Sequence, residues 1–296
     1  MIGMWWATIV SVLLVRCGIM ENMDDYQYLS GPNGWSGNTR FDDSKADIWF
    51  DVASVSMTVS RDPATNRATM VGKVREIVAA RPQVQMILFG ETTTGWYLGD
   101  SDKERNKTYQ DSIAETVPGT TSGIMQDLSE ELGVYIAFGI AERSGTDLYN
   151  SLVLVNPAGE IQAIHRKYLT VHSDVVTPLD YPYRNGDGAT VTEVDGIPFG
   201  LMICNDMHSW EIAKGFTDRK VKVVLSALAD KSKAPEEGGW SPISTVYNAW
   251  VVQANRYGTE GTEKYPGAIS ILDPAGSVRE SYDGDGWIAS RIGVYR

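Results

Sequence analysis

A short apolar run that ends on a cysteine is the feature that most constrains how this chain folds. Residues 200–204 read Gly-Leu-Met-Ile-Cys, and two polar residues and a helix-compatible segment follow at once. A buried strand in an α/β protein presents reactive groups at its carboxyl end, which makes Cys204 a candidate nucleophile. A core cysteine is the alternative interpretation, because free cysteines are among the most buried residues. Other segments must decide between these two.

Two further strand-like segments end on a chemically useful side chain. The apolar run 84–90 leads to Glu91, and a hairpin-like pair of runs over residues 149–167 ends on Lys167. A carboxylate can take the proton of a thiol, and a fixed ammonium group can stabilise the charge that develops on an attacked carbonyl. Glu91, Lys167 and Cys204 together therefore suit covalent catalysis.

In these segments the sequence resembles the nitrilase, or carbon–nitrogen hydrolase, superfamily. The matching motifs are Phe89-Gly-Glu-Thr-Thr-Thr-Gly-Trp-Tyr97, His165-Arg-Lys-Tyr-Leu169 and Ile203-Cys-Asn-Asp206 with Glu211 downstream. Their order, spacing and flanks agree with the family over roughly residues 47–296. The chain departs from the usual pattern at Gly90 and Trp210, where the family commonly has proline, and at Val246-Tyr247, where an acidic-Asn pair is usual.

The resemblance implies an α/β fold of the αββα sandwich type. Residues 150–167 and 267–280 resemble one another, each reading as strand, Pro-containing turn with glycine, and strand, which fits a pair of related sheet halves. We expect one catalytic domain over residues 47–296, preceded by an apolar segment and a polar linker within residues 1–46.

The resemblance also implies roles for particular residues. Glu91, Lys167 and Cys204 are expected to be catalytic. Glu142 is expected to be the second glutamate, which lies beside the lysine and positions substrate. Asn205 follows the nucleophile, and its backbone N–H is expected to help bind the oxyanion.

The predicted reaction is hydrolysis of a non-peptide C–N bond in a linear amide through a Cys204 acyl-enzyme. A nitrilase or an N-carbamoyl amine hydrolase would use the same triad, and a catalytically silent binding or scaffold protein is the alternative from another class. The amide is favoured because nothing resembles the Cys-Trp-Glu context of true nitrilases. Family members usually pair, so we expect a homodimer with the helix at residues 209–216 near its interface.

Composition and residue spacing argue against several other classes of function. The formal net charge of −12 argues against a nucleic-acid-binding surface, which needs clustered Lys and Arg. The two cysteines, Cys17 and Cys204, provide no disulfide framework, and the three histidines show no HExxH or paired spacing. Neither a metal nor a cofactor is therefore expected.

The amino-terminal run Met1–Val15 is apolar and uncharged. Its length suits the hydrophobic part of a signal peptide better than a membrane-spanning helix, although basic residues before it are missing. An exported or membrane-anchored protein is one interpretation. The others are a misassigned start codon in a cytoplasmic protein, or an apolar arm that packs on a neighbour.

Periodicity predicts the remaining elements. Strands are expected at 48–59, 133–140, 221–228, 249–256 and 287–294, and helices at 66–80 and 121–132. Polar loops are expected at 99–119, 171–190 and 230–239.

Overall fold

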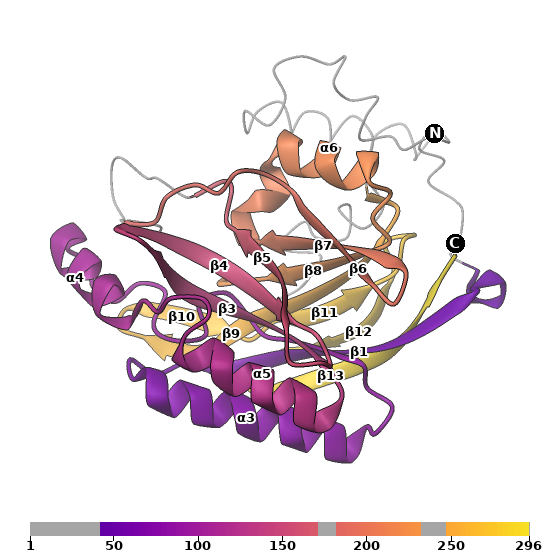
Figure 1. The fold of residues 1–296 in the computed structure, drawn as a ribbon, viewed down its shortest axis with the longest axis horizontal. Coiled ribbons are helices and arrows are strands. Elements are labelled where there is room, and N and C mark those ends of the chain that lie inside the picture. Colours follow the sequence, from indigo (N-terminus) through magenta and orange to yellow (C-terminus); the bar gives the residue numbers. More distant parts are fainter. Residues whose placement is uncertain (1–41, 171–181, 232–246, 296) are drawn as a thin grey trace.

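The computed structural model describes residues 42–170, 182–231 and 247–295. The strands in these ranges form two sheets that share strand β9 (Figure 1). The first sheet has the order β5-β4-β3-β2-β1, with β13 beside β1 and β10 beside β9. Its strands are β1 (Ile48–Thr58), β2 (Met86–Leu88), β3 (Tyr135–Ser144), β4 (Asp147–Val155), β5 (Ile161–Arg166), β10 (Glu263–Pro266) and β13 (Gly286–Val294).

The second sheet has the order β9-β8-β7-β6, with β11 and β12 beyond β9. Strand β9 (Trp250–Glu260) belongs to both sheets, because its first half pairs with β8 and β11 while its second half pairs with β1 and β10. The other strands are β6 (Thr190–Val194), β7 (Ile197–Ile203), β8 (Val223–Ala227), β11 (Ile269–Leu272) and β12 (Val278–Tyr282).

Helices cover the outer faces of the two sheets. Figure 1 shows α3 (Pro63–Ala80) and α5 (Thr120–Leu132) side by side on the first sheet, and α6 (Trp210–Asp218) on the opposite side of the molecule. Three apolar clusters fill the three interfaces between these layers. One lies between the sheets, one under α3 and α5, and one under α6. The expected αββα sandwich is confirmed.

Alternation along the strands explains how one sheet serves two cores. In β1, Phe50 and Val52 contribute to the cluster between the sheets, whereas Ala53 and Val55 pack under the helices. Side chains in a strand point alternately to opposite faces, so a strand buried on both sides reads as a continuous apolar run. The nearly uninterrupted burial of β1, β2, β8 and β9 therefore follows from the four-layer arrangement.

Most predicted elements are present, with shifted ends. The first helix starts at Pro63 rather than near residue 66, because Asp62 caps its first turn by accepting from the N–H groups of Ala64 and Thr65. Strand β3 was expected to stop near Ala141 but continues to Ser144, since it pairs with β4 up to a tight turn.

The prediction of a loop at 99–119 was wrong in its central part. Helix α4 (Lys103–Ile113) forms there, with Asp102 as its N-cap. Its buried positions are Asn106, Tyr109, Gln110 and Ile113. This is a helical spacing, but two of the four side chains are amides, so the hydrophobic pattern that predicts a helix is weak.

Several predictions fall outside the described residues. They concern the apolar run Met1–Val15, most of the loop at 171–190 and the loop at 230–239. Residues 43–45 of the predicted linker form a short 3₁₀ turn, η2 (Asp43–Lys45), and Asp43 is ion-paired with Arg279. In the described ranges, no helix is both long enough and apolar enough to cross a membrane.

Candidate active site

Glu91 is fully buried just beyond the end of β2. Its N–H donates to Leu228 O at 3.1 Å, at the end of β8, and the N–H of Thr93 donates to Gly139 O on β3 at 3.0 Å. Gly139 is required at this approach, because a Cβ there would lie 2.4 Å from Gly90 O. Backbone contacts with two neighbouring strands therefore fix the position of residues 91–97, which we call the glutamate segment.

Lys167 follows β5 and is also fully buried. Its Nζ lies 2.8 Å from Glu91 Oε1, which also accepts from Nδ2 of Asn150 at 2.6 Å. The N–H of Lys167 donates to Asn150 O, so β4 holds both partners of the ion pair. Removing one partner of a buried pair leaves an uncompensated charge, which makes this pairing costly to break. The structure thus brings Glu91 and Lys167 into direct contact.

Cys204 lies half-buried at the end of β7, where the short 3₁₀ segment η3 (Cys204–His208) begins. Its φ is 42°, a left-handed conformation that non-glycine residues rarely adopt outside strained or functional positions. The preceding residue, Ile203, pairs with Ala227 on β8, and the next residue of that segment, Leu228, accepts from Glu91 N. One strand therefore separates the two backbones, about 10 Å at ordinary strand spacing.

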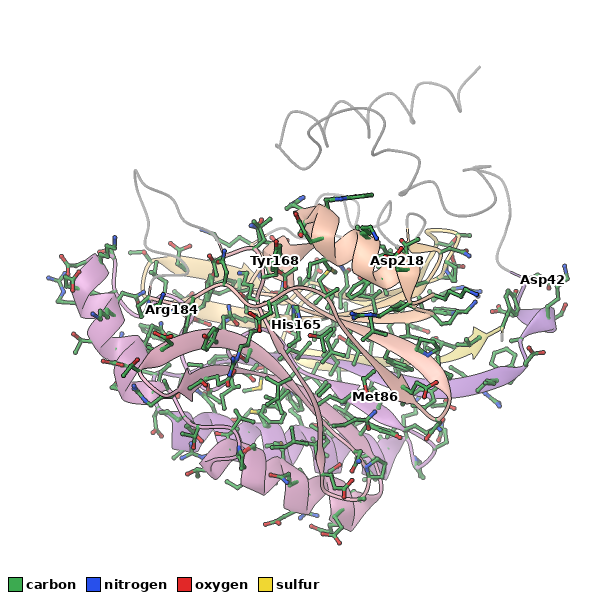
Figure 2. All side chains as sticks on the ribbon, turned by 45° about the horizontal axis from the view of Figure 1, so that its top comes forward. Asp42, Met86, His165, Tyr168, Arg184 and Asp218 are labelled. Atoms are coloured by element: carbon green, nitrogen blue, oxygen red, sulfur yellow. The ribbon has the colours of Figure 1, made fainter. Side chains whose placement is uncertain are left out.

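Asp206 ties the cysteine segment to the lysine segment. Its Oδ1 accepts from the N–H groups of Tyr168 and Leu169 at 2.9 and 2.7 Å. Its Oδ2 accepts from Ile203 N at 3.0 Å and lies 2.8 Å from His165 Nε2 (His165 and Tyr168 are labelled in Figure 2). Asp206 and His165 are fully buried. One carboxylate therefore contacts residues on both sides of Lys167 and the residue before Cys204.

Asn205 and Glu142 are less directly engaged. The side chain of Asn205 donates to Leu169 O at 3.1 Å, which adds a second link between the same two segments. Glu142 lies on β3 and accepts from Arg166 at 2.5 and 2.9 Å and from Ser151 at 2.6 Å. Strand pairing places Ser151 opposite Arg166, whereas Asn150 precedes Ser151 and points to the other face.

The structure therefore places Glu142 on the face of the sheet opposite to Asn150, against the neighbour of Lys167. Glu142, which was expected beside Lys167, contacts Arg166 instead, because the alternation of β4 and β5 separates the two faces of the sheet. A substrate-positioning role for Glu142 stays a prediction. In such a role Glu142 would act indirectly, through its contact with Arg166 and the backbone next to Lys167.

The described residues contain no group of three or more His, Cys, Asp or Glu side chains that could hold a metal ion. His208, four residues after Cys204, is largely surrounded by protein, and burial lowers its pKa below the ordinary 6.5. A neutral imidazole near the nucleophile is therefore expected at pH 7. The predicted independence from cofactors remains a prediction.

Comparison with known proteins identifies the family of this chain. Residues 51–279 match the sequence model of the family described as carbon-nitrogen hydrolase. This chain belongs to the carbon–nitrogen hydrolase family. The resemblance inferred from the three motifs is thereby confirmed.

Relatives of this hydrolase-family chain differ in their described activities. A nitrilase from Pyrococcus abyssi is 31% identical over 169 residues, which are 56% of this chain and 62% of that protein. The omega-amidase NIT2 of Mus musculus is 24% identical over 60% of this chain and 62% of its own length. These alignments thus span less than two thirds of either relative.

The fold is shared with solved structures at low sequence identity. A mutant of the Nesterenkonia AN1 amidase from the nitrilase superfamily superposes with a TM-score of 0.69 at 15% identity, covering 82% of this chain and 90% of that one. A CN-hydrolase superfamily protein from Xanthomonas campestris gives 0.67 at 18% identity, covering 83% and 91%.

Sequence reasoning missed Asn150 and Asp206, which bond to Glu91 and to the segments around Lys167 and Cys204. Asp206 had a signal, since a carboxylate two residues after a buried strand is rarely buried without bonding partners. Asn150 carries no comparable signal, since asparagine is common in turns near hairpins.

Proposed function

We propose that this protein hydrolyses the non-peptide C–N bond of a linear amide through a thioester on Cys204. The buried Glu91–Lys167 contact at 2.8 Å carries the proposal. It places a carboxylate and an ammonium group beside each other, one strand away from a cysteine in a strained conformation. Such a combination suits acyl transfer better than a purely structural role, because a buried ion pair is weak evidence for stability alone.

In the first half-reaction, Glu91 takes the proton of the Cys204 thiol as the sulfur attacks the carbonyl carbon. The tetrahedral intermediate carries a negative oxygen, which Lys167 and the N–H of Asn205 are proposed to stabilise. The C–N bond then breaks, and protonated Glu91 returns the proton to the leaving ammonia or amine. A thioester between Cys204 and the acyl group remains.

In the second half-reaction, Glu91 removes a proton from water, and the resulting hydroxide attacks the thioester carbonyl. The C–S bond breaks, the carboxylic acid leaves, and the proton returns to the thiolate. Throughout both steps Lys167 remains positively charged and holds Glu91 in place. Asn150 shares the same oxygen of Glu91, so the base turns little between the two half-reactions.

The substrate class is tested by comparing linear amides, nitriles and N-carbamoyl amines. Release of ammonia or amine from a linear amide, with a transient acyl adduct on Cys204 in intact-mass spectra, is the expected result. Cys204→Ala should show neither. Faster turnover of a nitrile or an N-carbamoyl amine would identify that class as the substrate instead, with the same three proposed catalytic residues. Absence of turnover and of any adduct would favour a silent binding protein.

The role of the base is tested with Glu91→Gln, which preserves size and removes basicity. Turnover is expected to fall roughly 10²- to 10⁴-fold while the fold persists. Near-normal turnover in the variant would make Glu91 merely a partner for Lys167. Labelling by acrylamide offers a second probe, since a Glu-to-Gln mutant of the amidase from Nesterenkonia sp. AN1 shows the result of Michael addition of acrylamide at its active-site cysteine.

The proposed assembly is a homodimer with α6 near the interface. Helix α6 buries Ile212, Ala213 and Phe216 against its own sheet, so only its outer side is available to a second copy. Sedimentation of the 32.6 kDa chain at micromolar concentration should give twice that mass. A purely monomeric species would contradict this proposal.

A further inference from the structure

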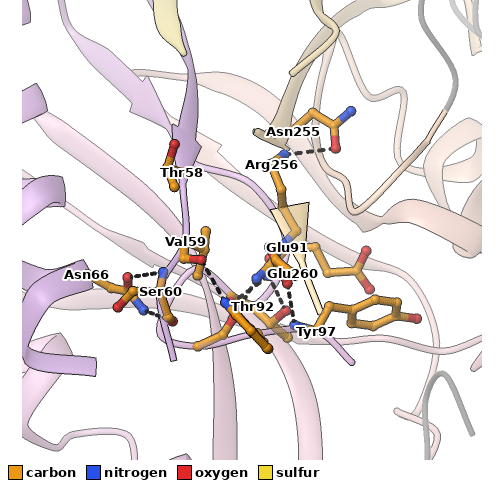
Figure 3. Close-up of polar contacts among 12 residues, drawn as sticks. Thr58, Val59, Ser60, Asn66, Glu91, Thr92, Tyr97, Asn255, Arg256 and Glu260 are labelled. Atoms are coloured by element: carbon orange, nitrogen blue, oxygen red, sulfur yellow. Dashed lines mark hydrogen bonds and ion pairs between the residues drawn. The ribbon is translucent and has the colours of Figure 1, made fainter. Parts of the chain in front are cut away.

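The buried guanidinium group of Arg256 contacts the segment that carries Glu91 at several points. One terminal nitrogen donates to Glu91 O at 2.7 Å and to Thr92 O at 2.9 Å, and the other donates to Gly95 O at 2.6 Å (Figure 3). The first nitrogen also reaches Thr92 Oγ1 at 2.7 Å. A single side chain thus satisfies three backbone carbonyls within five residues.

Glu260 completes this arrangement from the same strand. Its Oε1 lies 2.6 Å from Arg256 Nε, and its Oε2 accepts from Tyr97 N at 3.1 Å. The hydroxyl of Tyr97 in turn lies 3.5 Å from the Nζ of Lys167. Both members of the Arg256–Glu260 pair are buried, and the pair connects β9 to the start and the end of the glutamate segment.

The pair is also electrically matched to its surroundings. Burial raises the pKa of Glu260, and the neighbouring Arg256 charge opposes that effect. Burial acts to lower the pKa of Arg256, but Glu260 and other negative groups, Glu91 among them, hold it above its usual range. Two buried ion pairs, Lys167–Glu91 and Arg256–Glu260, therefore meet at the glutamate segment.

The glutamate segment needs such an anchor because it has no regular structure of its own. Residues 91–95 form turns after β2, and Thr92 has a φ of 45°. Buried carbonyl groups in a turn lack the ladder of partners that a strand or helix provides, and leaving them unpaired is costly. The fork of Arg256 supplies those partners, and a planar five-donor group does this in a way that lysine cannot.

We propose that Arg256 and Glu260 are positioning residues for the general base. They hold the backbone of residues 91–97 so that the Glu91 carboxylate meets Lys167 and faces Cys204. This inference rests on the proposed function of Glu91, and it adds a device in β9 that sets where the base lies. Neither residue is required to touch substrate.

The experiment compares Arg256→Lys with Arg67→Lys. Arg67 is a matched control, since it pairs with Glu115 at 2.9 Å in a partly buried position next to the start of α5. Both changes retain a positive charge and lose the fork. A misplacement of about 1 Å at a reacting group can cost roughly 10²-fold in rate, so kcat of Arg256→Lys should fall by that order with little change in KM. The control should keep its kcat.

The position of the base is measured directly in crystal structures of both variants. In Arg256→Lys the Glu91 carboxylate should move away from the Lys167 ammonium, which it meets at 2.8 Å in the parent, whereas Arg67→Lys should leave that contact unchanged. This readout needs no turnover. An unmoved Glu91 would overturn the positioning role, whereas a parent enzyme that hydrolyses no amide would reject only the proposed function.

Glu260→Gln provides a second variant if Arg256→Lys fails to fold. Glutamine keeps the size of the side chain but retains an acceptor for only one of the two donors, Arg256 and Tyr97. The loss of one charge-assisted hydrogen bond predicts a decrease in kcat of roughly 10-fold at similar KM. Unchanged kcat together with a lower melting temperature would show a role in stability alone and overturn the proposal.

Discussion

Two hairpins of similar sequence lie in different halves of the sandwich, β4–β5 in the first sheet and β11–β12 in the second. Their turns are alike. Asn156 accepts from two N–H groups within its turn at 3.0 Å, and Asp273 does the same at 2.9 Å. Gly159 and Gly276 occupy the equivalent left-handed position, with φ of 73° and 86°.

The second arms of the two hairpins differ completely. Strand β5 leads into the buried His165 and Lys167, whereas all five residues of β12 are exposed. The local sequence therefore sets the turn, and the layers around it decide whether the arm carries chemistry. Substitutions in the two hairpins test whether the surrounding layers account for this difference.

The largest effect is expected at the end of the first hairpin. Lys167→Met removes the positive charge that contacts Glu91 Oε1 and one proposed stabiliser of the oxyanion. Turnover should drop roughly 10²- to 10³-fold, and about 3–5 kcal/mol of stability should be lost because the buried ion pair is broken. Tyr282→Ala, in the exposed second arm of the other hairpin, should leave kcat unchanged. Steady-state kinetics and urea denaturation measure both variants, and an equal loss in both would refute the distinction.

A smaller effect is expected inside the arms. His165→Ala removes a buried ring and one partner of Asp206, which should cost about 3 kcal/mol. The exposed Tyr282 is the matched site, where replacement by alanine should cost under about 1 kcal/mol. Urea midpoints at pH 7 provide the measurement. Similar midpoints for the two variants would contradict the contrast in burial.

The turns themselves should respond alike. Alanine in a left-handed conformation costs about 1–2 kcal/mol, so Gly159→Ala and Gly276→Ala should both destabilise the protein. In Gly159→Ala the new Cβ would also lie 3.1 Å from Gln126 O on α5, which adds to the cost of the left-handed backbone. Thermal unfolding of both variants measures the two losses. A neutral result in either would mean that the turn relaxes.

The smallest effect is expected at Asp285, just after the second hairpin. It pairs with Lys73 at 3.0 Å and accepts from Thr58. Burial acts to raise the pKa of Asp285, but the hydrogen bonds from Lys73 and Thr58 outweigh burial and hold this pKa below the ordinary 3.8. Its stabilisation is therefore present above pH 3.8 and is lost as the pH falls through the lower, folded-state pKa.

Asp285→Asn should thus lower stability by less than about 1 kcal/mol at pH 7, because the carboxylate is partly exposed to solvent. The difference between variant and parent should shrink in acid. Denaturation curves at neutral pH and near pH 3 test this, and a difference that grows in acid would reverse the assigned sign.

The strands, and the places of Glu91, Lys167 and Cys204 directly after three of them, could be predicted because their signals are local. Each apolar run is short and continuous, and Glu91, Lys167 and Cys204 stand directly after one of them. Helix α4 could not be predicted in this way, because the amides Asn106 and Gln110 lie on its buried side and bond to the segment beyond Glu91. These positions are buried only because distant parts of the chain pack against them in the folded protein.

The contacts that hold the site together could not be predicted from the sequence either. Arg256 and the turn it binds are separated by more than 160 positions, and no local pattern connects an arginine to a distant carbonyl. Glu142 was likewise expected beside Lys167, but the alternation of side chains along β3 places it on the other face of the sheet.

Strand β9 has a consequence for the order in which the protein can be completed during synthesis. It joins both sheets, yet its residues emerge from the ribosome after those of β1 to β8, although β1 is its partner in the first sheet. Domains fold as units once their contacts exist. A nascent chain that has not reached Glu260 lacks both the strand shared by the two sheets and the proposed anchor of Glu91. Cys204, the proposed nucleophile, is therefore made well before Glu91, its proposed base, is held in its final position.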